Sequence, residues 1–169
     1  MIFLTTGTHE PFDRLLEAVD AWCDRSGSGH EIVAQATRSR IDPYRPRNFT
    51  PVPRLTPAEY ADHLSRAMLV ISHAGIGSIL SALGARKPIV VMPRRGHLRE
   101  TRNDHQHATI RRFPAYPGLF VAEDETVFGT VLDHALQCCA DSATPAISPF
   151  AGAALTDALH GFFERSGRD

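Results

Sequence analysis

Short apolar runs alternate with amphipathic stretches along this chain, and that alternation limits the folds that it can adopt. The runs at 2–5 (IFLT), 68–72 (MLVIS) and 88–93 (PIVVMP) are apolar at nearly every position. Such runs are typical of parallel strands that are covered on both faces. Between the first two runs, apolar residues recur at spacings of three and four from Phe12 to Trp22, which indicates a helix. The sequence therefore predicts an α/β fold, with a Rossmann-like parallel sheet flanked by helices.

The other elements follow from the same periodicities. Strands are expected at 31–36 and 118–122, with a short one near 49–52. Pro11 suits the first turn of the first helix, and Thr56 begins a capping-box sequence, TPAE. Further helices are expected at about 57–66, 77–85, 104–113, 124–139 and 149–165.

Composition excludes several classes of partner. The 169 residues fit one domain, and 43% hydrophobic content is enough to bury a core. A net charge of −1 gives no general attraction to nucleic acid, so we expect none as a partner. The three cysteines, Cys23, Cys138 and Cys139, make a poor disulfide framework and are expected to be reduced. No apolar stretch approaches the roughly 20 residues that span a bilayer, so membrane association is expected to be peripheral.

Three polar turns follow expected strands: TTGTHE (5–10), SHAGIGS (72–78) and PRRGHLRETRNDHQ (93–106). Ligands of open parallel sheets bind at the carboxyl ends of the strands, where helix N-termini also point. Convergence of the three turns is a stronger sign of a site than any one turn alone.

The second turn has the chemistry of a phosphate site. Gly75 and Gly77 allow close approach to the backbone, while Ser78 and His73 add donors at the start of a helix. A tight packing turn explains the two glycines about equally well. A dinucleotide site is disfavoured, because Leu80 stands where the GxGxxG pattern needs its third glycine and 31–36 ends without an acidic residue.

The other two turns carry further candidates. The third turn holds a mixture of charges that is either a solvated loop or a sugar site, because histidine and glutamine offer donors and acceptors to hydroxyl groups. Asp104 is alternatively only an N-cap. In the first turn, Gly7 is a third close-approach position, and Thr6 and Thr8 supply hydroxyls. His9 is a general base, a ligand-binding group or simply a surface residue. Asp13 and Arg14 are expected to form surface ion pairs. The arginines of the third turn are Arg94, Arg95, Arg99 and Arg102.

The segments around these three turns resemble those of a known family. The series ISHAGIGSILSALGARKPIVVMPRR…NDHQ resembles the nucleotide-sugar-binding C-terminal half of MurG-type GT-B glycosyltransferases, the glycosyltransferase family 28 C-terminal domain. The opening TTGTHEPFDRLL is similar to that of the short members. These are the PssE/EpsF-like exopolysaccharide transferase subunits and the catalytic subunit of the eukaryotic dolichol-linked GlcNAc transferase. The resemblance covers 1–113, and 93–113 is most similar to the exopolysaccharide group.

The resemblance implies a role for each matching residue. Asp104 and Asn103 would lie in the donor-sugar loop, and His9 is the candidate base on this chain, although the resemblance places the base rather on a partner. Ser81 stands where MurG-like enzymes have an acidic ribose-binding residue, so ribose recognition is not accounted for. The implied donor diphosphate contacts are Gly7, Thr8, His73, Gly75, Gly77 and Ser78. The implied donor-sugar contacts are Glu100, Asn103, Asp104, His105 and Gln106.

The resemblance also implies a function. Residues 1–169 would form a single domain equivalent to the C-terminal half of a GT-B enzyme, with a UDP-sugar as donor and with neither metal nor cofactor. A membrane-associated PssD-like partner would bind the lipid-linked saccharide acceptor and hold this chain at the cytoplasmic face of the membrane. A non-catalytic nucleotide-sugar-binding or regulatory subunit is the alternative. The sugar itself stays open, although the arginines of the third turn would suit an anionic one.

Overall fold

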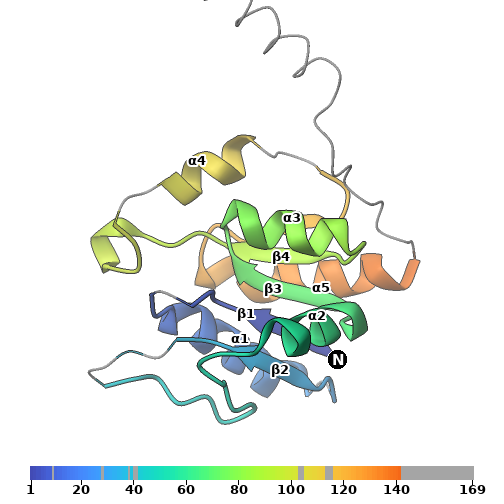
Figure 1. Cartoon of the computed structure of the whole chain (residues 1–169), viewed down its shortest axis with the longest axis horizontal. Coiled ribbons are helices and arrows are strands. Elements are labelled where there is room, and N and C mark those ends of the chain that lie inside the picture. The colour runs from blue at the N-terminus through green and yellow to red at the C-terminus, as the bar shows by residue number, and fades with distance from the viewer. Residues whose placement is uncertain are drawn as a thin grey trace, which may run out of the picture.

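The computed structural model describes residues 1–8, 10–27, 29–37, 39, 42–102, 105–112 and 116–141. Within these ranges the strands form a single parallel sheet in the order β2-β1-β3-β4-β5 (Figure 1). This confirms the predicted α/β class. The strands are β1 (Ile2–Thr5), β2 (Ile32–Gln35), β3 (Leu69–His73), β4 (Ile89–Met92) and β5 (Leu119–Val121).

The helices agree with the predicted periodicity, apart from small shifts at their ends. The capping box at Thr56 is confirmed, because its hydroxyl accepts from the Glu59 N–H and the Glu59 carboxylate accepts from the Thr56 N–H. The first helix begins two residues after Pro11, which therefore lies outside its first turn. The helices are α1 (Asp13–Ser26), α2 (Pro57–Arg66), α3 (Ile76–Gly84), a 3₁₀ turn η1 (Gly96–Leu98), α4 (His105–Arg112) and α5 (Glu125–Asp141).

Two predicted elements have other outcomes. The strand expected near 49–52 is reduced to one bridge, in which Val52 pairs with Gln35 beside β2. The helix expected at 149–165 lies outside the described residues.

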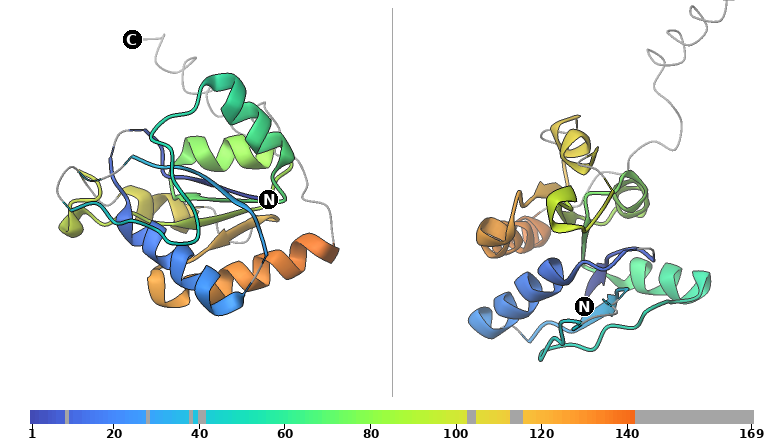
Figure 2. Two further views of the ribbon diagram at one scale, coloured as in Figure 1. Left: turned by 90° about the horizontal axis from the view of Figure 1, so that it is seen from below. Right: turned by 90° about the vertical axis from the view of Figure 1, so that its left-hand side faces the viewer.

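The sheet is buried on both faces, as its apolar strands require. Ile2 and Leu4 of β1 pack into a core with α1 and α5, while Phe3 between them packs into a second core with α2 and α3. Figure 2 shows these two helix pairs on opposite sides of the sheet. No helix in the described part of the chain is long and apolar enough to cross a membrane.

The register of the sheet brings the polar turns to one edge. Thr5 of β1 is level with Ser72 of β3, and His73 is level with Met92 of β4. The Ser72 hydroxyl donates to the Thr5 carbonyl at 2.7 Å, which ties together the carboxyl ends of β1 and β3. The predicted convergence of the three turns is therefore confirmed at the level of the backbone.

Candidate functional site at the carboxyl edge of the sheet

The imidazole of His73 occupies the centre of this edge, between two of the turns. A Cβ atom on Gly75 would lie 2.4 Å from His73 Nε2, and one on Gly7 would lie 3.4 Å from His73 Cε1. Gly7 also has a φ of +79°, which residues that carry a side chain rarely adopt. Ser72 Oγ lies 3.3 Å from His73 Nδ1 on the other side of the ring. Gly7 and Gly75 therefore make room for the histidine, a role that the sequence did not indicate.

The start of α3 adjoins this histidine. Gly75 is the N-cap, and no side chain caps the helix. Nothing lies within 4 Å of a Cβ atom built on Gly77, so of the two glycines in this turn Gly77 borders open space. Main-chain N–H groups in the first turn of a helix, together with its dipole, attract anions. Ser78 is half-buried in the same turn, and Ser81 is exposed one turn further on.

The third turn is held by Arg94, whose side chain points into the protein. Arg94 is only 3% exposed. Its guanidinium donates to four main-chain carbonyls, three in the segment after β1 and one at Glu100. Burial lowers the pKa of Arg94 to about 10, against the opposing effect of the Glu10 and Glu100 charges, so the group stays cationic at neutral pH. Arg94 is thus a structural cation and does not reach a sugar carboxylate.

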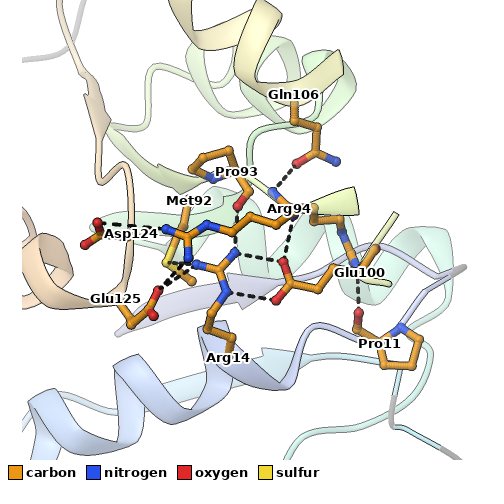
Figure 3. A network of polar contacts seen from close by, with 10 residues as sticks. Pro11, Arg14, Met92, Pro93, Arg94, Glu100, Gln106, Asp124 and Glu125 are labelled. Carbon is orange, nitrogen blue, oxygen red and sulfur yellow. Dashed lines mark hydrogen bonds and ion pairs between the residues drawn. The ribbon is translucent and has the colours of Figure 1, made fainter. Parts of the chain in front are cut away.

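A second arginine approaches the same turn from α1. Arg14 Nε and Nη2 donate to the two carboxylate oxygens of Glu100, each at 2.8 Å, and Nη2 also donates to the Pro93 carbonyl. Figure 3 shows the guanidinium of Arg14 between Glu100 and Glu125, the latter an ion-pair partner at 2.9 Å. Burial alone would lower the pKa of Arg14, but the hydrogen bonds to the two glutamates raise it. The expected surface ion pair is therefore wrong: Arg14 forms a largely buried one that joins three elements.

The remaining arginines of the turn divide into two kinds. Arg95 lies 3.9 Å from both Asp124 and Glu125, while Arg99 and Arg102 are exposed. Two of the four cations are thus engaged by the protein itself, which weakens the argument for an anionic donor sugar.

Gln106 completes the described part of the site. Its side chain is 5% exposed, and Oε1 accepts from the Arg94 N–H at 3.0 Å. That bond turns the amide so that Nε2 is directed away from Arg94 (Figure 3). His9, Asn103 and Asp104 lie outside the described residues, as does the side chain of His105. No group of three or more potential ligands able to hold a metal ion occurs in the described ranges.

Comparison with known proteins identifies the architecture. Residues 1–112 match the glycosyltransferase family 28 C-terminal domain. The chain belongs to this family. The family 28 match includes all three turns and both arginines that hold them.

Two further comparisons agree with the family. The chain is 37% identical over 101 residues to "UDP-N-acetylglucosamine transferase subunit ALG13" of Yarrowia lipolytica (strain CLIB 122 / E 150). That alignment covers 54% of this chain and 52% of the relative, so the chain spans about half the length of the curated relative that it matches. The fold is also similar to a solved structure described as the glycotransferase of kitacinnamycin, with a TM-score of 0.58 and 18% identity, over 83% of this chain and 35% of that one. The structural match shows the fold alone, which is that of a GT-B C-terminal domain.

The family 28 domain brings together some of the predicted site residues. Gly7 and Gly75 each lie close to the His73 ring, and the start of α3 with Gly77 and Ser78 adjoins them. Glu100 and Gln106 bind the protein through their oxygens, Glu100 to Arg14 and to the Arg95 N–H and Gln106 to the Arg94 N–H, so their contact with a sugar stays a prediction. Thr8 is exposed, whereas the Thr6 hydroxyl is buried without a partner in the described structure. Sequence reasoning noticed Arg14 and Arg94 but missed their function as loop anchors.

Proposed function

We propose that this chain is the donor-binding, catalytic subunit of an inverting glycosyltransferase. It would transfer a sugar from a UDP-sugar to a lipid-linked saccharide in exopolysaccharide or capsule synthesis, as in the PssE/EpsF-like group. Family membership supports a glycosyltransferase, and the Yarrowia lipolytica relative is itself named as a transferase subunit. The observation that carries the proposal is the position of Gly7, the start of α3 and Gln106 beyond three adjacent strands of one sheet.

The donor diphosphate would bind at the start of α3. The first turn of α3 has no side-chain cap, Gly77 borders open space, and the imidazole of His73 is adjacent. These features suit a group with two or three negative charges. In the reaction, the acceptor oxygen forms a bond to the anomeric carbon as the bond from that carbon to UDP breaks. The helix-end amides stabilise the charge that develops on the departing UDP. The acceptor proton passes to a base, for which the candidates are a partner residue and His9.

The donor sugar would lie against the third turn. Gln106 Nε2 can donate to a sugar hydroxyl while Oε1 stays with the Arg94 N–H, and His105 precedes it at the start of α4. Glu100 would act through the loop that it anchors to Arg14. Ser81 is exposed and neutral, so the ribose would be recognised by other groups.

The acceptor would be supplied by a second subunit. We propose a membrane-associated, PssD-like partner that binds the lipid-linked saccharide and holds this chain at the cytoplasmic face. The proposed reaction uses no metal, no other cofactor and no nucleic acid.

The test is transfer by membranes that contain this chain and its partner, supplied with a panel of UDP-sugars. We expect product from one donor in the presence of a chelator, and loss of most of that product with Gln106→Ala. Gln137→Ala is the matched control, because Gln137 is exposed on α5. Unchanged transfer by Gln106→Ala would show that the donor sugar does not lie against the third turn. Binding of the UDP-sugar without transfer under any condition would favour the non-catalytic, regulatory alternative.

A further inference from the structure

One buried cation connects the two loops that the proposed function assigns to a single donor. We propose that Arg94 is a positioning residue of the donor site, which holds the turn after β1 and the loop after β4 in one fixed arrangement. The presentation of the donor's diphosphate and of its sugar would then depend on the same side chain. This inference rests on the proposed function, which puts the diphosphate beside Gly7 and the sugar beside Gln106.

On one side, Arg94 fixes both ends of the turn after β1. Nη2 donates to the carbonyls of Thr6 at 2.7 Å and Glu10 at 2.8 Å, and Nη1 donates to the Pro11 carbonyl at 2.6 Å. Gly7 directly follows Thr6 in the chain, and its backbone lies against the His73 ring. Movement of Arg94 would therefore release the turn on which Gly7 sits.

On the other side, Arg94 fixes the loop after β4. Nη1 donates to the Glu100 carbonyl at 2.9 Å, and the main-chain N–H of Arg94 donates to Gln106 Oε1 at 3.0 Å. Arg14 holds the carboxylate of the same glutamate from α1. Arg94 therefore binds the main chain of Glu100, and Arg14 binds its side chain.

The arrangement requires a guanidinium group in particular. Its planar fork carries five N–H donors and meets four carbonyls that lie in different directions, whereas a lysine has three donors on one nitrogen. The plane is also fixed from one face, because Arg94 Cζ lies 4.7 Å from the centre of the Phe12 ring. Lysine at position 94 would keep the charge but satisfy fewer carbonyls.

The experiment compares the full-length chain with Arg94→Lys. Calorimetry gives the affinity for UDP-N-acetylglucosamine and for UDP, and amide hydrogen exchange is followed in segments 5–12 and 94–102. We expect about tenfold weaker binding of the UDP-sugar, because the two released loops must be ordered again when the donor binds, and faster exchange in both segments. Arg66→Lys is the control, because Arg66 forms an exposed pair with Asp62 in the described part of the chain, and it should change neither measurement.

Each outcome separates the possibilities. Unchanged affinity in Arg94→Lys would overturn the inference even if the variant melts at a lower temperature, because a purely structural role requires only the loss of stability. Faster exchange in only one segment would overturn the claim that the loops are coupled. If the unaltered chain binds neither UDP nor any UDP-sugar, the proposed function fails and this inference fails with it. Should Arg94→Lys not fold, Phe12→Leu removes the ring beneath the guanidinium and should weaken donor binding in the same direction; unchanged affinity there would also overturn the inference.

Discussion

His73 and Gly75 are packed so closely that position 75 has no room for a side chain. A Cβ atom there would lie 2.4 Å from Nε2 and 2.9 Å from Cδ2 of the imidazole, whereas one at Gly77 would meet nothing within 4 Å. The two glycines of one short turn therefore differ in purpose. Gly75 accommodates the histidine, and Gly77 leaves the first turn of α3 open to a ligand.

Alanine substitutions separate these purposes. Gly75→Ala should displace the imidazole and lower the free energy of unfolding by about 1–3 kcal/mol, the usual cost of overpacking. Gly77→Ala should leave stability within about 1 kcal/mol of the original, because alanine suits a helix better than glycine. Both should weaken UDP binding in calorimetry. A stable Gly77→Ala chain that binds UDP normally would mean that the diphosphate does not lie on this turn.

The ion pair of Arg14 with Glu100 should contribute more to stability than an exposed pair. The two side chains are 11% and 10% exposed, against 60% and 56% for Arg66 and Asp62. Arg14→Met leaves the Glu100 carboxylate without its cation and should cost about 3 kcal/mol, whereas Arg66→Met should cost less than about 1 kcal/mol. Urea unfolding of both variants measures the difference. Equal costs would show that the pair does not anchor the loop.

Acidification should remove the contribution of Asp20. This buried carboxylate accepts from the Tyr44 hydroxyl at 2.7 Å and from the Asn48 N–H at 2.9 Å, and Arg47 N–H donates as well. Burial alone would raise the pKa of Asp20, but these hydrogen bonds together lower it. The stabilisation is therefore present above the unfolded pKa of about 3.9 and is lost as pH falls below it. The difference in unfolding free energy between the original chain and Asp20→Asn should shrink from pH 7 to pH 3; a constant difference would contradict this.

Tyr44 should resist ionisation at alkaline pH. Burial and its hydrogen bond to Asp20 raise the pKa of Tyr44 to about 12. Because the unfolded phenol ionises near pH 10, the fold should lose this stabilisation between about pH 10 and 12. Ultraviolet titration of the original chain minus that of Tyr44→Phe isolates this group. A midpoint near 10 in the difference curve would show that Tyr44 is not held by Asp20.

The elements of the fold were predictable because local signals agree with one another. β4 is apolar throughout and β3 is apolar from Leu69 to Ile71. Thr56 and Glu59, three positions apart, mark the start of a helix. Such signals depend on short stretches of sequence. The reduction of the strand near 49–52 to one bridge depends instead on pairing with β2, which no local pattern determines.

The anchoring of the site was not predictable for the same reason. Arg94 and Glu100 stand in a run of mixed charges that is typical of a solvated loop. Their burial follows from the carbonyls of Thr6, Glu10 and Pro11 and from Arg14, which are more than 80 positions away in the chain. Glycine patterns were also ambiguous, since Gly75 next to an imidazole and Gly77 next to open space look identical in sequence.

Binding of a UDP-sugar at the carboxyl edge of the sheet is the central claim, and an amide-resolved NMR titration with UDP-N-acetylglucosamine tests it most directly. We predict shifts of the Gly7, Gly77 and Ser78 amides and of the Gln106 side-chain amide, saturating together with one affinity. The amide chemical shifts of α5, which packs with α1 against one face of the sheet, should stay unchanged. No shifts with UDP-N-acetylglucosamine or with any other UDP-sugar of the panel, or shifts that avoid the start of α3, would contradict the account.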